Sequence, residues 1–201
     1  MPRMRSARAT SPFGLRLALV FLVFSIACSR ESDEQLVAKV NAGVESGSFH
    51  KQPEQLEAVA TLLGRGHARA KEPDVVDCLI STGALLLTDD ADWTDRAEAR
   101  VVYNLIKRYD DTSVVDSLVR KVIEDQTHRL HVLFLGIKLG ISGSQIRLNQ
   151  TLAEHGDKKM AEDFLNAGSS ELYEGGKRWA NAHGYSIETG MGSHRASWGS
   201  F

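Results

Sequence analysis

The chain of 201 residues has only two cysteines, Cys28 and Cys78, so at most one intramolecular disulfide can form. Cys78 lies in an apolar stretch beside Asp74 and Asp77. A reactive thiol needs basic neighbours that lower its pKa, whereas free cysteine is among the residue types most often buried. We therefore expect Cys78 to be a core residue rather than a nucleophile.

Several motifs of catalytic and ligand-binding sites are missing. No glycine-rich loop followed by Lys and Ser or Thr is present to bind phosphate, and no nucleophile elbow occurs in a strand-turn-helix context. The acidic segment 89–95 lacks the glycine and the glutamate of an EF-hand calcium loop. His128 and His131 are three residues apart, but a zinc site needs about two more ligands. The sequence thus predicts no cofactor and no metal.

One candidate set for chemistry remains near the C-terminus, where His183, Glu188 and His194 lie close together in sequence. Two imidazoles and a carboxylate could bind a metal or serve a hydrolase. Their spacing matches no pair on one helix face, and packing of His183 beside Trp179 is the simpler interpretation. An envelope hydrolase that uses Glu188 with His183 or His194 stays open as an alternative function.

The N-terminal segment has a clear pattern. Its basic residues are Arg3, Arg5, Arg8 and Arg16, an apolar run covers residues 17–27, and no acidic residue precedes Glu31. A basic region, a short apolar region and small residues at a cleavage site are typical of a secretory signal. A membrane span needs about 20 apolar residues, and this run has roughly half of them.

The segment Phe24-Ser25-Ile26-Ala27-Cys28 resembles the lipobox of bacterial lipoproteins. The resemblance implies that Cys28 is acylated and becomes the mature N-terminus, on a protein anchored in the cell envelope. Ser29 then favours the outer membrane, facing the periplasm. An ordinary secretory leader with an incidental Cys28 and a transmembrane helix remain the alternatives.

The net charge of the chain indicates which partners it can attract. The chain has 24 basic and 26 acidic residues, and removal of the leader with its four arginines leaves a net charge of about −6. An acidic domain is not attracted to nucleic acid or to anionic lipid. We therefore expect no nucleic-acid partner, and attachment to a membrane would depend on acyl chains.

The remaining ~174 residues suit one domain, and their apolar residues follow the 3.6-residue period of amphipathic helices. Ser32 and Gln35 match a capping box, as do Ser142 and Gln145, and Ser113 with Asp116 marks another helix start. The apolar run 132–137 predicts a central, buried helix. The expected helices begin near residues 32, 53, 73, 93, 113, 127, 145, 157 and 170.

These helices predict an all-α fold, either an irregular bundle or a short solenoid of eight to nine helices. The segment 92–96 opens one helix, and a similar segment, 125–129, opens another 33 residues later. This pattern resembles HEAT-type repeats over roughly residues 50–183. The resemblance implies an extended concave surface for binding partners.

We divide the chain into a signal peptide (1–27), a lipidated tether (28–33), a helical domain (34–183) and a Gly/Ser-rich tail (184–201). The tail contains aromatic residues, which favour an ordered loop or a partner-binding peptide. The predicted function is a lipid-anchored, non-catalytic interaction or scaffold domain, with the hydrolase and a carrier of an apolar ligand as alternatives. The candidate interaction residues are His183, Glu188, His194, Arg195 and Trp198.

Overall fold

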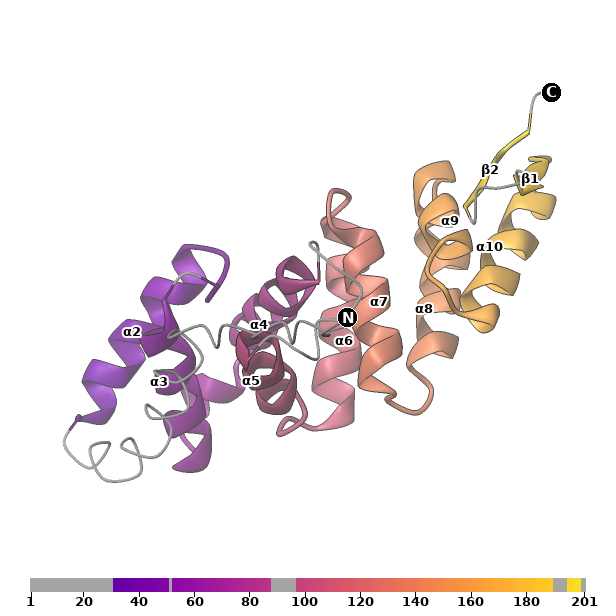
Figure 1. The fold of residues 1–201 in the computed structure, drawn as a ribbon. Coiled ribbons are helices and arrows are strands. Elements are labelled where there is room, and N and C mark those ends of the chain that lie inside the picture. The colour runs from indigo at the N-terminus through magenta and orange to yellow at the C-terminus, as the bar shows by residue number, and fades with distance from the viewer. Residues whose placement is uncertain (1–30, 51, 88–96, 190–194, 200–201) are drawn as a thin grey trace, which may run out of the picture.

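The structure, a computed structural model, describes residues 31–50, 52–87, 97–189 and 195–199. Helices dominate this part of the chain, which confirms the all-α prediction. They form an elongated array in which α2 and α10 lie at opposite ends (Figure 1). The leader with Cys28, the acidic segment 89–95, His194 and Phe201 lie outside the described residues.

The helices agree closely with the pattern of apolar residues. Within the described ranges none of them has the length and apolar character that a membrane span needs. The elements are α2 (Asp33–Glu45), α3 (Pro53–Gly64), η1 (Ala68–Lys71), α4 (Pro73–Leu86), α5 (Ala97–Ile106), α6 (Asp111–Glu124), α7 (Arg129–Leu139), α8 (Ser144–His155), α9 (Lys158–Leu165), α10 (Ser170–Ala182), β1 (Ile187–Thr189) and β2 (Ala196–Trp198).

The first helix begins with the predicted capping box. The Ser32 hydroxyl accepts a hydrogen bond from the Gln35 backbone N–H at 3.3 Å, and the Gln35 side chain accepts one from the Ser32 N–H at 3.1 Å. Each bond satisfies a backbone donor that the helix itself leaves without a partner. Pro53 and Pro73 occupy the first turns of α3 and α4, where proline costs no hydrogen bond.

Two predicted helix starts are wrong, one by three residues and one by two. The N-cap of α6 is Asp110 and not Ser113, because the Asp110 carboxylate accepts the Ser113 N–H at 2.9 Å. The next helix, α7, begins at Arg129 and not at Thr127. Asp125 accepts the His128 N–H at 3.0 Å, so the residues between them form a turn instead of a helix.

The predicted capping box of Ser142 and Gln145 is also wrong. The N-cap of α8 is Gly143, which has φ +78° and makes no side-chain cap. The Gln145 side chain is hydrogen-bonded to the Ser169 hydroxyl, which lies just before α10. A contact with a distant segment therefore replaces the local one.

The centre of the array is built on α4 and α7. The apolar run in α7 is central and buried as predicted, with Val132, Leu133 and Leu135 at 0% exposure. Gly83 of α4 makes the close approach possible, since a Cβ there would lie 2.9 Å from a methyl carbon of Leu135. Cys78 is buried, and burial raises the pKa of its thiol to about 12, so it is an inert core residue.

The C-terminal tail contains a pairing that the sequence pattern did not predict. In the described residues β1 pairs antiparallel with β2, with Glu188 opposite Ser197. The Asn166 side chain continues this pairing from the end of α9. Its Oδ1 accepts the Ala196 N–H at 2.8 Å, and its Nδ2 donates to the Ala196 carbonyl at 3.1 Å. The sheet is thereby attached to α9.

Candidate functional site

Four aromatic rings from α10 and the tail lie in contact in a row at the C-terminal end of the array. The Trp179 ring lies 4.0 Å from that of His183 and 5.8 Å from that of Tyr185, measured between centroids, and Tyr185 lies 5.2 Å from Trp198. We call these four residues the aromatic row. Trp179 and His183 meet because residues four apart share a helix face, which confirms the interpretation of His183 as a neighbour of Trp179.

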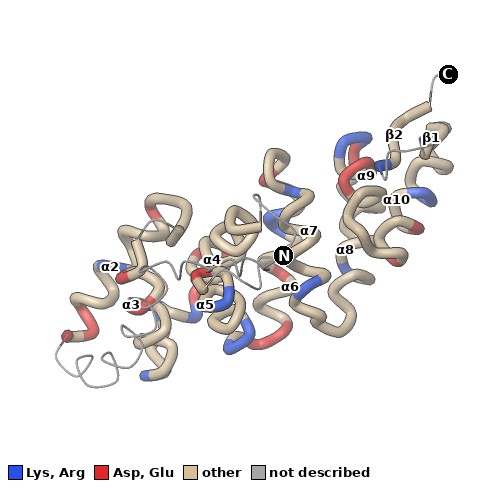
Figure 2. Tube along the Cα trace, in the orientation of Figure 1, with Lys and Arg blue, Asp and Glu red and all other residues tan. Residues whose placement is uncertain are grey.

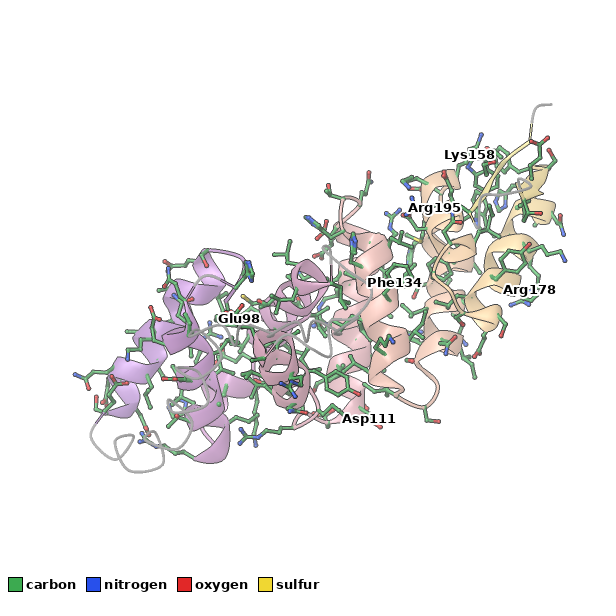
Figure 3. The ribbon with its side chains drawn as sticks, viewed as in Figure 1. Glu98, Asp111, Phe134, Lys158, Arg178 and Arg195 are labelled. Carbon is green, nitrogen blue, oxygen red and sulfur yellow. The ribbon has the colours of Figure 1, made fainter. Side chains whose placement is uncertain are left out.

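Charged residues of α9 hold the tail end of this row. The Lys158 ammonium lies 5.0 Å from the centroid of Tyr185 and 5.3 Å from that of Trp198, within the range of cation–π attraction. The Trp198 Nε1–H donates to a carboxylate oxygen of Glu162 at 3.2 Å. Lys158 and Arg195 both lie at this end of the molecule (Figure 3). Trp198 is therefore half-buried and engaged by its own chain.

The structure does not join the candidate hydrolase residues into one set. His183 Nδ1 lies 2.8 Å from the Trp179 carbonyl, to which it can donate. Glu188 is exposed on β1, and within the described ranges no hydrogen bond or ion pair links it to His183. No group of three or more His, Cys, Asp and Glu side chains in these ranges could hold a metal ion. Arg195 is exposed, and His194 lies outside the described residues.

A groove between α8 and α10 adjoins the aromatic row. It consists of a hollow of about 510 Å³ and a second one of about 270 Å³ that share Asn149, Ala153 and Arg178. The second hollow reaches His183 and Trp179, so the groove ends at the row. The α8–α10 groove is lined by Ile146, Asn149, Gln150, Leu152, Ala153, Glu171, Glu174, Gly175, Arg178, Trp179, Ala182 and His183.

A contact between the two helices fixes the depth of the groove. The Asn149 Nδ2 donates to the carbonyl of Glu171 at 3.0 Å, which draws α8 onto α10. A Cβ on Gly175 would lie only 1.7 Å from the Asn149 Oδ1, so no residue with a side chain fits there without displacing the Asn149 side chain. Ala153 and Ala182 have small side chains, so they do not fill the floor of the groove.

The rim of the groove combines an apolar side chain with charges. Ile146 is 57% exposed, more than the other large exposed hydrophobic residue of the described chain, Ile123 at 37%. Glu171 and Arg178 are exposed, and Arg178 points away from the array (Figure 3). An apolar strip with charged edges suits contact with another protein surface.

A second polar cluster joins α7 to α9. Arg129 is 1% exposed and donates through Nε to the Val122 carbonyl at 2.6 Å. Its Nη1 lies 3.6 Å from Asp163, which is also buried, and 3.8 Å from Asp157. A charge this deep requires an opposite charge nearby. Because Arg129 and Asp163 are both buried, we interpret this cluster as a structural joint.

The described residues also border a hollow between α3, α4 and α5. Its volume is about 70 Å³, and Phe49, Leu56 and Val102 are among the residues that line it. Pockets for small-molecule ligands usually measure about 300–1,000 Å³. This hollow therefore does not favour the carrier of an apolar ligand.

Comparisons of the chain with protein-family models, with curated proteins and with solved structures find no match. The candidate site is therefore identified from the geometry of the structure alone. Sequence reasoning placed the candidate interaction residues at the end of the molecule where the groove lies, but it did not predict the groove. The one local signal was Ile146 on the otherwise polar face of α8. The depth of the groove depends on Asn149 and Gly175, which are 26 residues apart in sequence.

Proposed function

We propose that this protein is a lipid-anchored protein of the bacterial envelope, and that it binds another protein through the α8–α10 groove. The observation that carries the proposal is the exposed Ile146 beside an apolar floor with exposed charged residues at its edge. A large exposed apolar side chain at such a surface favours a protein partner.

The anchor in this proposal is Cys28, on the strength of the lipobox resemblance and the leader before it. The mature chain is acidic, so acyl chains rather than charge would hold it at a membrane. Acidic and basic residues are interspersed along the described array (Figure 2). This mixture supports a protein partner over nucleic acid. We place the protein at the outer membrane, facing the periplasm.

A HEAT-like solenoid is the architecture we propose for the helical domain. The elongated array in Figure 1 supports it, because stacked helices in such proteins present extended binding surfaces. The groove at the α10 end would then be the specific contact, and the rest of the array would act as a scaffold.

The test is photo-crosslinking in intact cells, with a photoreactive amino acid at position 146. A matched variant carries the same group at position 123, the other exposed isoleucine, on α6. We expect one discrete adduct from position 146 and none from position 123. Equal yields from both positions, or no adduct from either, would contradict the proposal.

A further inference from the structure

The edge of the α8–α10 groove carries opposite charges at two points along α10. Neither the Glu171 carboxylate nor the Arg178 guanidinium has an ion-pair or hydrogen-bond partner among the described residues. The two residues are seven positions apart, so about two helical turns, or roughly 10.5 Å, separate them on one face. A second α10 turned end for end would place Glu171 against Arg178 twice.

The apolar parts of the groove follow the same twofold pattern. Ile146 lines the hollow that Glu171 also lines, and it is absent from the hollow at the other end. That second hollow, of about 270 Å³, is bordered by the small residues Ala153, Gly175 and Ala182. The same rotation places each Ile146 over the small-residue hollow of the other copy. A surface that is complementary to itself in this way is the requirement for a twofold interface.

We propose that the occupant of the groove is a second copy of this chain, and that the two α10 helices pair antiparallel. The inference rests on the proposed function, because it names the partner at the same groove. Glu174 lies 3.9 Å from Lys177 of its own helix. In this pairing the two Glu174 side chains lie near the twofold axis, and each keeps Lys177 of its own helix as a counter-charge.

Anchoring would favour this association. Two copies held in one membrane by acyl chains meet at a much higher effective concentration than free copies do. Two exposed ion pairs and two small apolar contacts are individually weak, but they can hold a dimer under that condition.

The test is sedimentation equilibrium of the full acylated chain in detergent, with the solvent density matched to that of the detergent. The wild type is expected as a monomer–dimer equilibrium. Glu171→Arg and Arg178→Glu each replace two attractive contacts by two repulsive ones. Each variant alone should weaken dimerisation at least about tenfold. Glu45→Arg on α2, at the far end of the array, is the control and should dimerise like the wild type.

Restoring the opposite charges distinguishes a lost interface from a damaged fold. In an equimolar mixture of Glu171→Arg with Arg178→Glu, both cross-pairs are again of opposite charge, so heterodimers should form. The double variant should recover dimerisation for the same reason. A protein that is damaged by either substitution would not recover on mixing.

Three results would overturn the homodimer. They are a wild type that stays monomeric, single variants that dimerise like the wild type, and singles that fail to recover on mixing. A monomer whose position 146 crosslinks to a different protein would overturn the homodimer and leave the proposed function standing. A 146 adduct of twice the chain mass would support both.

Discussion

Arg129 is the largest fully buried side chain of the described core, and its charge determines how firmly α7 holds α9. The guanidinium depends on Asp163, which lies 3.6 Å away and is itself 5% exposed. The Asp157 carboxylate is 52% exposed and 3.8 Å away, so it compensates less well. The joint therefore rests on one buried pair.

Asp163→Ala should destabilise the protein by about 3 kcal/mol, because it leaves a buried positive charge without a close counter-charge. Urea unfolding measures the loss. Lys159→Ala removes the other partner of Asp163, an ammonium at 2.8 Å that is 59% exposed, and should cost less than about 1 kcal/mol. Equal losses in the two variants would show that the buried pair has no special weight.

His131 should make stability depend on pH. Burial, with a smaller contribution from His128, lowers the pKa of its imidazole. Since the unfolded ring titrates near 6.5, the unfolded chain binds a proton that the folded chain resists, and stability falls as pH drops below about 6.5.

Because the His131 ring is only partly buried, its contribution should change the unfolding free energy by less than about 1.4 kcal/mol per pH unit. His131→Gln should flatten the dependence of the unfolding free energy between pH 7.5 and 5.5. The control His155→Gln replaces an exposed histidine and should leave this dependence as it is in the wild type. An unchanged slope in His131→Gln would assign the dependence to other groups.

At the scale of elements, the Asn166 side chain holds the backbone of β2 to the end of α9. Asn166 exchanges two hydrogen bonds with the backbone of Ala196, which is 5% exposed, and each bond contributes about 1 kcal/mol. Asn166→Ala should release β2 and expose the bond after Arg195 to trypsin.

Mass spectrometry after limited digestion should show faster loss of residues 196–201 from Asn166→Ala than from the wild type. Asn181→Ala, at an exposed asparagine of α10, is the matched control and should be cut at the wild-type rate. Identical rates in all three proteins would mean that Asn166 does not hold the tail.

The helices could be predicted because their signals are local. The Ser32–Gln35 capping box and the two prolines act within one turn, and the 3.6-residue period does not depend on neighbours. The tail sheet and the start of α8 could not be predicted, because distant contacts decide them. The Asn166 side chain accepts a hydrogen bond from the Ala196 N–H, and the Gln145 side chain bonds to Ser169 instead of to its own helix start.

At the scale of the molecule, the prediction of an anchored protein depends on Cys28. Cys28→Ser removes the acylated side chain and should move the protein from the membrane fraction to the soluble fraction, because two acyl chains suffice for stable anchoring. Cell fractionation and blotting measure this. Cys78→Ser, at the buried cysteine, is the control and should remain in the membrane. A membrane-bound Cys28→Ser protein would contradict the anchor.

The candidate site could be predicted only as a region. Trp198 drew attention to the C-terminal end because it stood out in a Gly/Ser-rich tail, and His183 did so because Glu188 and His194 follow it closely in sequence. The groove itself depends on how closely α8 approaches α10, and Gly175 sets that distance by leaving room for Asn149. A glycine within a helix gives no sign of what it accommodates until the neighbouring helix is known.

The order of the helices in the array has a mechanical consequence. Each helix packs mainly on elements that are near it in the chain, and α2 and α10 are far apart (Figure 1). A pull applied between the two ends must therefore pass along the whole array, from one group of packed helices to the next. The softest joint then sets the compliance of the whole. In a protein tethered beside α2 and held at its groove, the load between the two attachments would cross the whole helical array.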